Sequence, residues 1–226
     1  MGMKQKLSIA ELVKREKRCR ALGLDLMCDW DFAHDNGENP DGTRCARNFV
    51  EHFENFRKRG AGLFFFGSTG SGKSFTAAQI VNALTDRGYN CLFTSFLTII
   101  SDLSTLGFEA RRNYLDQFGN KDLVVFDDFG SEGDTNSNNQ LIMQIVNNCR
   151  RRMIPMIFTT SLHQETLDKS SSTPRLLALS RIKQLCTTVT LYEPGARRDD
   201  RRLNRMEAEA LLKGKNYAAQ QALALE

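Results

Sequence analysis

"GLFFFGSTGSGKSFTAAQIVNAL", residues 62–84, places a glycine-rich turn between two apolar segments. The run "GLFFF" is continuously apolar, which is typical of a strand buried on both faces. The segment "KSFTAAQIVNALTDRG" has the spacing of an amphipathic helix. Between them, "GSTGSGKS", residues 67–74, matches the pattern G-x-x-x-x-G-K-[ST]. Strand, turn and helix therefore follow one another in the order that a phosphate-binding loop requires.

Each residue type in this turn has a physical role in binding phosphates. Glycines let backbone N–H groups turn inward, and the helix N-terminus adds a partial positive charge. Lys73 would reach the β- and γ-phosphates of a nucleotide, and the Ser74 hydroxyl would be a ligand of Mg²⁺. We therefore expect ATP and Mg²⁺ as cofactors, with the nucleotide bound by Gly67, Ser68, Thr69, Gly70, Ser71, Gly72, Lys73, Ser74 and Phe75.

A second motif, "LVVFDDFGSEGD", lies at residues 123–134. Its four apolar residues predict another buried strand, which ends in Asp127 and Asp128. A nucleoside triphosphatase needs a carboxylate at the carboxyl end of a neighbouring strand, facing the Mg²⁺. We assign this role to Asp127, and to Asp128 the orientation or deprotonation of the attacking water. Paired Asp residues before Gly also begin ordinary surface turns, but the two motifs support each other.

The rest of the chain repeats a short apolar run, a loop and an amphipathic helix from residue 62 onward. Strands that alternate with helices predict a parallel sheet in an α/β fold. We expect five parallel strands flanked by helices, with a short helical N-terminal extension and a helical C-terminal tail. The five runs are "GLFFFG", "NCLFTSF", "LVVFDD", "PMIFTTS" and "CTTVTLY".

Composition gives broader limits. The chain has 226 residues with a net charge of +4, and basic residues are concentrated near the N-terminus, in "CRRRM" and in "GARRDDRRLNR". Such patches suit a polyanionic partner, although each is equally compatible with a solvated helix face. No apolar stretch approaches the ~20 residues that a membrane span needs, so we expect no membrane partner and a cytoplasmic location.

The six cysteines form no C-x-x-C pair. Their spacing therefore predicts neither a zinc module nor a disulfide framework, and we expect reduced thiols. An irregular metal site made of Cys19, Cys28 and Cys45 with His34 or His52 is the alternative.

Further features distinguish classes of phosphate-loop protein. The guanine-recognition pattern N-K-x-D and the transporter pattern "LSGGQ" are absent. The predicted strand "PMIFTTSLH" ends in hydroxyl residues, which can contact the γ-phosphate or the attacking water: Thr159, Thr160 and Ser161. Arg181 and Arg198 offer the rigid guanidinium fork that suits transition-state phosphate charge.

Residues 45 to about 205 resemble the AAA+ ATPases of the DnaC/IstB type, the bacterial and phage helicase loaders and transposition helper ATPases. The matching text is "GLFFFGSTGSGKSFTAAQIVNAL", "DLVVFDDFGSE", "IPMIFTTSL", "SRI" and "GARR". The resemblance implies an AAA+ core with a reduced C-terminal lid. It divides the chain into a helical extension that could bind a partner (1–44), the core (45–205) and a helical tail (206–226).

The resemblance also implies roles for individual residues. Sensor 1 falls on Ser161, where the family usually has Asn, and Thr160 is the fallback. Arg181 matches the arginine finger, which acts in trans on a neighbour's ATP, so an ATP-dependent homo-oligomer follows. Arg198 matches sensor 2, which acts in cis.

The segment "STLGFEARRNYLDQF" is a candidate contact for single-stranded DNA, because it combines cations with aromatic rings that could stack on bases. The residues concerned are Phe108, Arg111, Arg112 and Tyr114. The alternative is an amphipathic helix whose Phe and Tyr lie in the core.

The function expected from the resemblance is ATP hydrolysis in DNA replication, by a helicase loader that binds single-stranded DNA and a replicative helicase. Two alternatives stay open: an IstB-like transposition helper that binds a transposase, and a nucleotide-gated scaffold with little hydrolysis. The scaffold is suggested by Asp128 and Ser161, two short side chains at catalytic positions.

Overall fold

The computed structural model describes residues 8–162 and 173–192. These residues belong to the first of two compact units, residues 1–192, whereas the second unit, 193–226, lies outside the described residues. No helix in the described part of the chain is long and apolar enough to cross a membrane.

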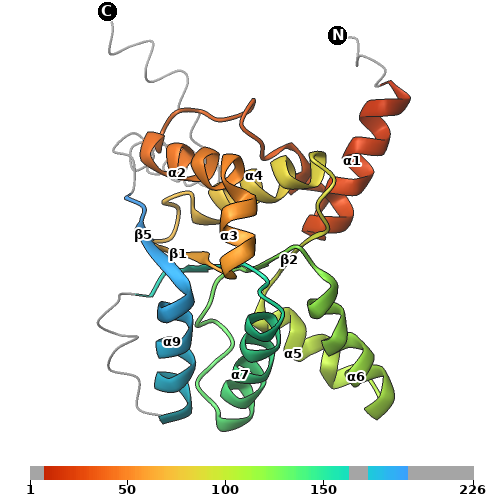
Figure 1. Cartoon of the computed structure of the whole chain (residues 1–226), viewed down its shortest axis with the longest axis vertical. Helices are drawn as coiled ribbons and strands as arrows, with labels where there is room; N and C mark the ends of the chain where they lie inside the picture. The colour runs from red at the N-terminus through yellow and green to blue at the C-terminus, as the bar shows by residue number, and fades with distance from the viewer. Residues whose placement is uncertain (1–7, 163–172, 193–226) are drawn as a thin grey trace, which may run out of the picture. The chain divides into compact units, whose positions relative to one another are not determined.

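Five parallel strands form one sheet in the order β2-β3-β4-β1-β5 (Figure 1). The strands are β1 (Gly62–Phe66), β2 (Cys91–Thr94), β3 (Leu123–Phe126), β4 (Met156–Thr160) and β5 (Cys186–Thr190). Every neighbouring pair is parallel. The predicted five-stranded parallel α/β sheet is confirmed.

Helices cover both faces of the sheet, which explains why β1, β3 and β4 are buried along their whole length. One face carries α1 (Ile9–Leu22), η1 (Asp25–Asp29), α2 (Pro40–Glu51), α3 (Phe53–Arg59) and α4 (Lys73–Asp86). The other carries α5 (Phe96–Thr105), α6 (Phe108–Asp116), η2 (Gln117–Asn120), α7 (Asn136–Arg151) and α9 (Thr173–Leu185).

Strand β1 shows how the alternating side chains supply two cores. Phe64 and Phe66 lie in the core under α5 and α7, whereas Leu63 and Phe65 lie in the core under α2 and α4. All four are buried, with at most 5% of each residue exposed. Because successive side chains of a strand point to opposite faces, one apolar run stabilises both layers.

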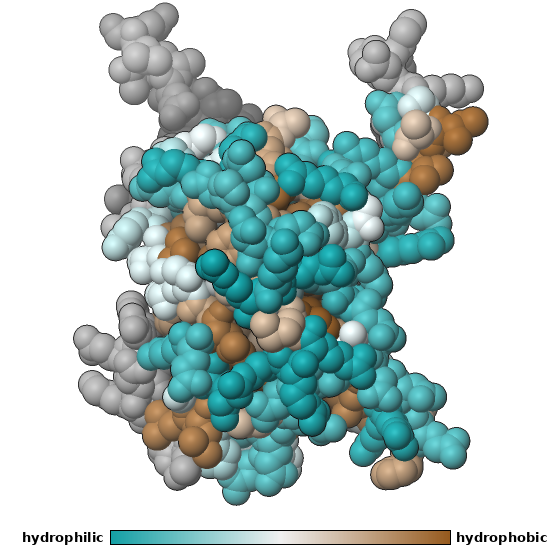
Figure 2. All heavy atoms as spheres, viewed as in Figure 1, coloured by the Kyte–Doolittle hydropathy of each residue, from teal (hydrophilic) through white to brown (hydrophobic). Residues whose placement is uncertain are grey.

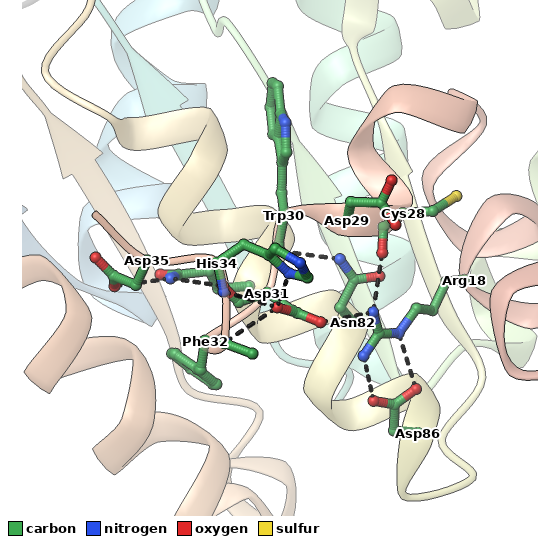
Figure 3. A network of polar contacts seen from close by, with 12 residues as sticks. Arg18, Cys28, Asp29, Trp30, Asp31, Phe32, His34, Asp35, Asn82 and Asp86 are labelled. Carbon is green, nitrogen blue, oxygen red and sulfur yellow. Dashed lines mark hydrogen bonds and ion pairs between the residues drawn. The ribbon is translucent and has the colours of Figure 1, made fainter. Parts of the chain in front are cut away.

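Residues before the sheet are tied to α4 by a polar network (Figure 3). The buried Arg18 donates to Asp31 at 2.8 Å and to Asp86, on α4, at 2.6 Å. The Asn82 amide donates to the carbonyl oxygens of Met27 at 3.0 Å and Trp30 at 2.9 Å. These bonds satisfy polar groups that would otherwise be buried at a cost, and they fix the segment between α1 and α2 along α4.

Among the carboxyl groups of this network, Asp31 has the most strongly shifted pKa. Burial acts to raise its pKa, but hydrogen bonds from His34 and Arg18 outweigh burial and lower the pKa to about 2. The side chain is therefore ionised throughout the neutral range, and its charge is balanced by the buried guanidinium.

The cysteines differ from the expectation. Cys19, on α1, and Cys28, on η1, form a disulfide with their Cα atoms 5.6 Å apart, so the prediction of reduced thiols is wrong for this pair. The sulfur atoms and the Asp25 carboxylate lie within 4.8 Å of one another, and Cys45 is not part of this group. The other four cysteines are free. Burial raises the pKa of the Cys91 and Cys149 thiols to about 12, which keeps them in the unreactive protonated form.

Candidate nucleotide site

The phosphate loop connects the carboxyl end of β1 to the first residue of α4. Gly72, the N-cap, has φ 87°, a left-handed conformation that favours glycine. A side chain on Gly67 would place its Cβ 2.2 Å from the carbonyl oxygen of Leu191. Lys73 is buried, and its Nζ donates to the carbonyl oxygens of Gly67 at 2.8 Å and Ser68 at 2.7 Å. The loop thus holds an ammonium group at the N-terminus of a helix.

Three hydroxyl and carboxylate side chains meet beside this loop. The Ser74 hydroxyl, on α4, donates to the Asp127 carboxylate at 2.8 Å. The Thr159 hydroxyl, on β4, donates to the same carboxylate at 2.6 Å. The sheet order makes this possible, because β4 lies between β1 and β3 and all three strands end at one edge. Asp127 therefore stands where the sequence predicts it, facing Ser74.

Asp128 follows Asp127 in a strained turn. Its φ is 53°, and its backbone N–H donates to the Thr159 hydroxyl oxygen at 2.9 Å. A left-handed conformation costs a non-glycine residue roughly 1–2 kcal/mol, and such strain is concentrated at functional sites. The side chain is exposed, and within residues 8–162 and 173–192 its carboxylate accepts no hydrogen bond. The carboxylate is thus open to solvent beside the phosphate loop.

The oxygen atoms at this edge fit a hard cation. The Ser74 hydroxyl and the Asp127 carboxylate are the ligand types that Mg²⁺ prefers, and they already lie within hydrogen-bond distance of each other. Gly70 and Gly72 have φ of 91° and 87°, conformations that allow the loop N–H groups to turn toward a polyphosphate. The residues present therefore suit a magnesium–nucleotide complex.

The predicted hydroxyl residues at the end of β4 differ in their surroundings. Thr160 is fully buried, and its hydroxyl donates to the carbonyl oxygen of Phe129 at 2.7 Å, on the far side from Asp127. Ser161 is half-buried just after the strand. The hydroxyl that contacts both aspartates belongs to Thr159, whereas the family resemblance implies sensor 1 at Ser161 or Thr160.

Of the two candidate arginines, one lies within the described residues. Arg181 lies on α9 and is half-buried. Arg198 lies outside the described residues. The catalytic roles of both arginines, and of Ser161 and Thr160, stay predictions.

Sequence reasoning missed a contact from the N-terminal segment to the phosphate loop. Asn39 is the N-cap of α2 and accepts from the Gly42 N–H, while its amide donates to the carbonyl oxygen of Ser71 at 3.0 Å. The Trp30 ring lies 5.7 Å from the ring of Phe75, on the first turn of α4. The pair Asn-Pro at 39–40 signals a helix start, but nothing in it indicates the loop that the amide would contact.

A buried ion pair connects the turn after Asp128 to α9. Glu132 and Arg175 are 6% and 4% exposed and form a salt bridge. The guanidinium also lies 4.3 Å from the centre of the Phe129 ring, and Glu132 accepts from the Gly130 N–H at 2.8 Å. The turn that begins at the acidic pair is therefore fixed to α9.

The candidate DNA residues divide between surface and core. Phe108 is 88% exposed, and Arg111 and Arg112 are exposed on the same helix, α6. Tyr114 instead packs against the core and donates to Asp102 at 2.7 Å. Burial raises the pKa of its phenol, so Tyr114 remains protonated and is part of the scaffold of α6.

The sheet order, the phosphate loop and the acidic end of β3 together define a P-loop protein of the AAA+ fold. Comparison with known proteins shows which members of that class the chain is similar to. The family model described as RNA helicase matches residues 63–157, from β1 to β4. The replicative helicase loader DnaC of Escherichia coli strain K12 is 29% identical over 127 residues, which are 55% of this chain and 51% of DnaC. The chain thus spans about half the length of the curated relatives it matches.

Solved structures show the same fold at lower identity. DnaI superposes with a TM-score of 0.58 at 23% identity, covering 80% of this chain and 92% of that one. The DnaC helicase loader gives 0.56 at 23%, covering 70% and 92%. The replication initiator DnaA bound to AMPPCP and single-stranded DNA gives 0.53 at 22%, covering 66% and 46%. Together these similarities support a DnaC-type AAA+ protein, which confirms the resemblance drawn from the motifs.

Proposed function

We propose that this protein binds and hydrolyses ATP and acts in DNA replication as a helicase loader. The observation that carries the proposal is the meeting of Ser74, Asp127 and Thr159 beside the phosphate loop, with the Asp128 carboxylate open to solvent. The similarity to DnaC loaders supports the choice of a replicative helicase as partner, and the structural similarity to DnaA bound to single-stranded DNA supports that ligand.

The residues at this edge divide the work of phosphoryl transfer. Lys73 and the loop N–H groups would hold the phosphates, and Ser74 and Asp127 would hold Mg²⁺. When bound, Mg²⁺ supplies positive charge that stabilises the developing phosphate charge. Asp128 would accept the proton of the attacking water, and the Thr159 hydroxyl would fix the Asp128 backbone. Ser161 or Thr160 would act as sensor 1.

Arginines would complete the site on assembly. Arg181 would reach the ATP of a neighbouring copy, and Arg198 would contact ATP in its own chain. On this proposal a single copy lacks one cation of its transition-state site, so hydrolysis should be slow until copies assemble.

Hydrolysis is tested by phosphate release from purified protein, with and without single-stranded DNA. Asp128→Asn should keep ATP affinity within about twofold and lower turnover by at least roughly 100-fold, because the amide cannot accept a proton. Lys73→Ala should instead weaken ATP binding itself. Retained turnover in Asp128→Asn would move the base elsewhere, and no turnover in the wild type under any condition would favour the nucleotide-gated scaffold.

The arginine finger and the partner are tested separately. Arg181→Ala should abolish the rise in turnover that comes with protein concentration while leaving ATP binding unchanged. A pull-down with a replicative helicase and a transposase as baits should capture this protein on the helicase. Capture by the transposase alone would contradict the loader assignment and favour a transposition helper.

Single-stranded DNA binding is assigned to α6, where Phe108, Arg111 and Arg112 are exposed together. An exposed aromatic ring beside two guanidinium groups can stack on a base while the cations bind phosphates.

A further inference from the structure

Cations gather at the amino edge of the sheet, opposite the nucleotide site. Helix α3 ends just before β1, η2 ends just before β3, and α7 ends just before β4, so the residues that precede these strands share one edge. We call this surface the basic face, and its members are Arg57, Lys58, Arg59, Lys121, Arg150, Arg151 and Arg152.

Direct contacts show that these segments are neighbours. Arg57 pairs with Asp122 at 2.7 Å, and Arg152 donates to the carbonyl oxygen of Gly119 at 3.2 Å. A Cβ on Gly60, after α3, would lie 3.1 Å from the Cα of Met153, after α7. Figure 2 shows hydrophilic residues over the ends of α3 and α7 in the middle of the view.

Hollows run along the basic face. A pocket of about 450 Å³ is lined by four cations, by two carboxylates and by the residues before β3 and β4; the charged residues are Arg57, Lys58, Lys121, Arg152, Glu54 and Asp122. Lys121 also lines a second pocket of about 340 Å³, which includes Lys17 and Arg20 of α1. A third, of about 470 Å³, adjoins Arg150 and Arg151 on α7. The first two pockets share Lys121 and are therefore adjacent, and cations outnumber carboxylates in their lining.

Few carboxylates balance this charge. Glu54 and Asp122 both pair with Arg57, and they also accept hydrogen bonds from Tyr89 at 2.8 Å and from the Asn90 N–H at 2.8 Å. Within the described ranges, the other six cations of the basic face have no carboxylate within 4.0 Å. Cations are favourable near helix C-termini because the helix dipole places about half a negative charge there. The C-termini of α3 and α7 together supply only about one negative charge. The positive charge therefore exceeds what the helices need.

We propose that the basic face binds the phosphate backbone of nucleic acid at a site separate from α6. Tyr89 is the single aromatic residue lining the first two pockets, and its hydroxyl is bound to Glu54. Binding here uses cations without stacking, so it is independent of base sequence, and duplex DNA binds at least as well as a single strand. The site needs no ATP hydrolysis, so it stands or falls independently of the proposed function.

The test is fluorescence anisotropy of the full chain, without nucleotide, on a labelled duplex and on a single strand of equal length. The triple variant Lys121→Gln, Arg150→Gln and Arg151→Gln should raise the Kd for duplex roughly tenfold. The slope of log Kd against the logarithm of the salt concentration should decrease by about 2–3, because three phosphate contacts are lost. Thermal melting checks that each variant is folded.

Two controls make the result specific. The triple variant Lys14→Gln, Arg44→Gln and Arg47→Gln removes the same charge from α1 and α2 and should leave Kd within about twofold. Arg111→Gln with Arg112→Gln should weaken single-strand binding while leaving duplex binding in place.

Three outcomes would overturn the proposal: an unchanged Kd and salt slope in the basic-face variant, an equal loss in the α1–α2 control, or a loss confined to the single strand. If the protein proves to have no ATPase activity but the basic-face variant still loses duplex affinity, this proposal holds while the proposed function fails.

Discussion

Thr159 serves two residues of the nucleotide site with one hydroxyl group. It donates to the Asp127 carboxylate and accepts from the Asp128 N–H, so it sets the position of both acidic residues. Thr159 is 1% exposed, so burial shields both hydrogen bonds from solvent. This arrangement makes Thr159 a positioning residue for Asp128.

Thr159→Val should therefore lower turnover about 10- to 100-fold while ATP binding changes much less. Valine keeps the shape of threonine but removes a hydrogen bond to a charged group, worth about 1.5–3 kcal/mol. Thr159→Ser keeps the hydroxyl and should restore most of the activity. Steady-state kinetics with a melting curve for each variant would check this, and wild-type kcat in Thr159→Val would contradict it.

Asp31 gives the second prediction at the residue scale. Its folded-state pKa of about 2 lies below the value of about 3.9 in an unfolded chain. The ionised carboxylate therefore contributes stability above about pH 4, and this contribution is lost as the pH falls toward 2.

Asp31→Asn should lower the free energy of unfolding at pH 7, and the difference from wild type should shrink between pH 4 and 2. Urea unfolding at several pH values measures this. Asp41→Asn, at an exposed pair with Arg44, is the matched control and should have little effect. A difference that is constant from pH 7 to pH 2 would show that the charge of Asp31 is not the cause.

At the scale of elements, α9 is fixed to the turn after β3 by the buried pair of Glu132 and Arg175. Arg175→Met leaves the Glu132 charge buried without its cation and should destabilise the protein by about 3–5 kcal/mol. Adding Glu132→Gln should recover much of that loss, because the buried charge is removed. Denaturant unfolding of both single variants and the double variant completes a double-mutant cycle. If the losses in unfolding free energy of the two single variants simply add in the double variant, Glu132 and Arg175 are not coupled.

The elements themselves follow from the sequence where local rules suffice. Continuous apolar runs predict β1, β3 and β4, and the glycine pattern with Lys73 predicts the phosphate loop. Two adjacent threonines end β4, and alternation sends their side chains to opposite faces. The sequence does not say which face meets Asp127, because the placement of β4 between β1 and β3 arises only in the folded sheet.

At the scale of the whole molecule, contacts between distant segments were the least predictable. Asn39 is hydrogen-bonded to Ser71, 32 residues further along the chain, and Arg18 to Asp86, 68 residues further along. Polar residues of this kind occur in any loop, and their partners are chosen by the packing of α1 and α2 on α4. The disulfide was missed for the same reason, since a spacing of nine residues has no local signature.

The disulfide between α1 and η1 should stabilise the whole described unit. Closing a loop of this length contributes about 2–3 kcal/mol by restricting the unfolded chain. Cys19→Ser with Cys28→Ser should therefore lower the free energy of unfolding by that amount, and reductant should lower wild type equally. Urea titrations with and without dithiothreitol measure both. Cys45→Ser should leave the effect of reductant intact, and a wild type insensitive to reductant would contradict the prediction.

The turn from Asp128 to Glu132 has a mechanical consequence for an assembly of several copies. One end is hydrogen-bonded to Thr159 beside the phosphate loop, and the other is paired with Arg175 of α9, the helix that carries Arg181. Five residues of chain thus connect the solvent-exposed Asp128 carboxylate to the helix that carries the proposed arginine finger. If the proposed arginine finger is right, this turn would couple the position of Asp128 in one copy to the position of Arg181 beside the ATP of its neighbour.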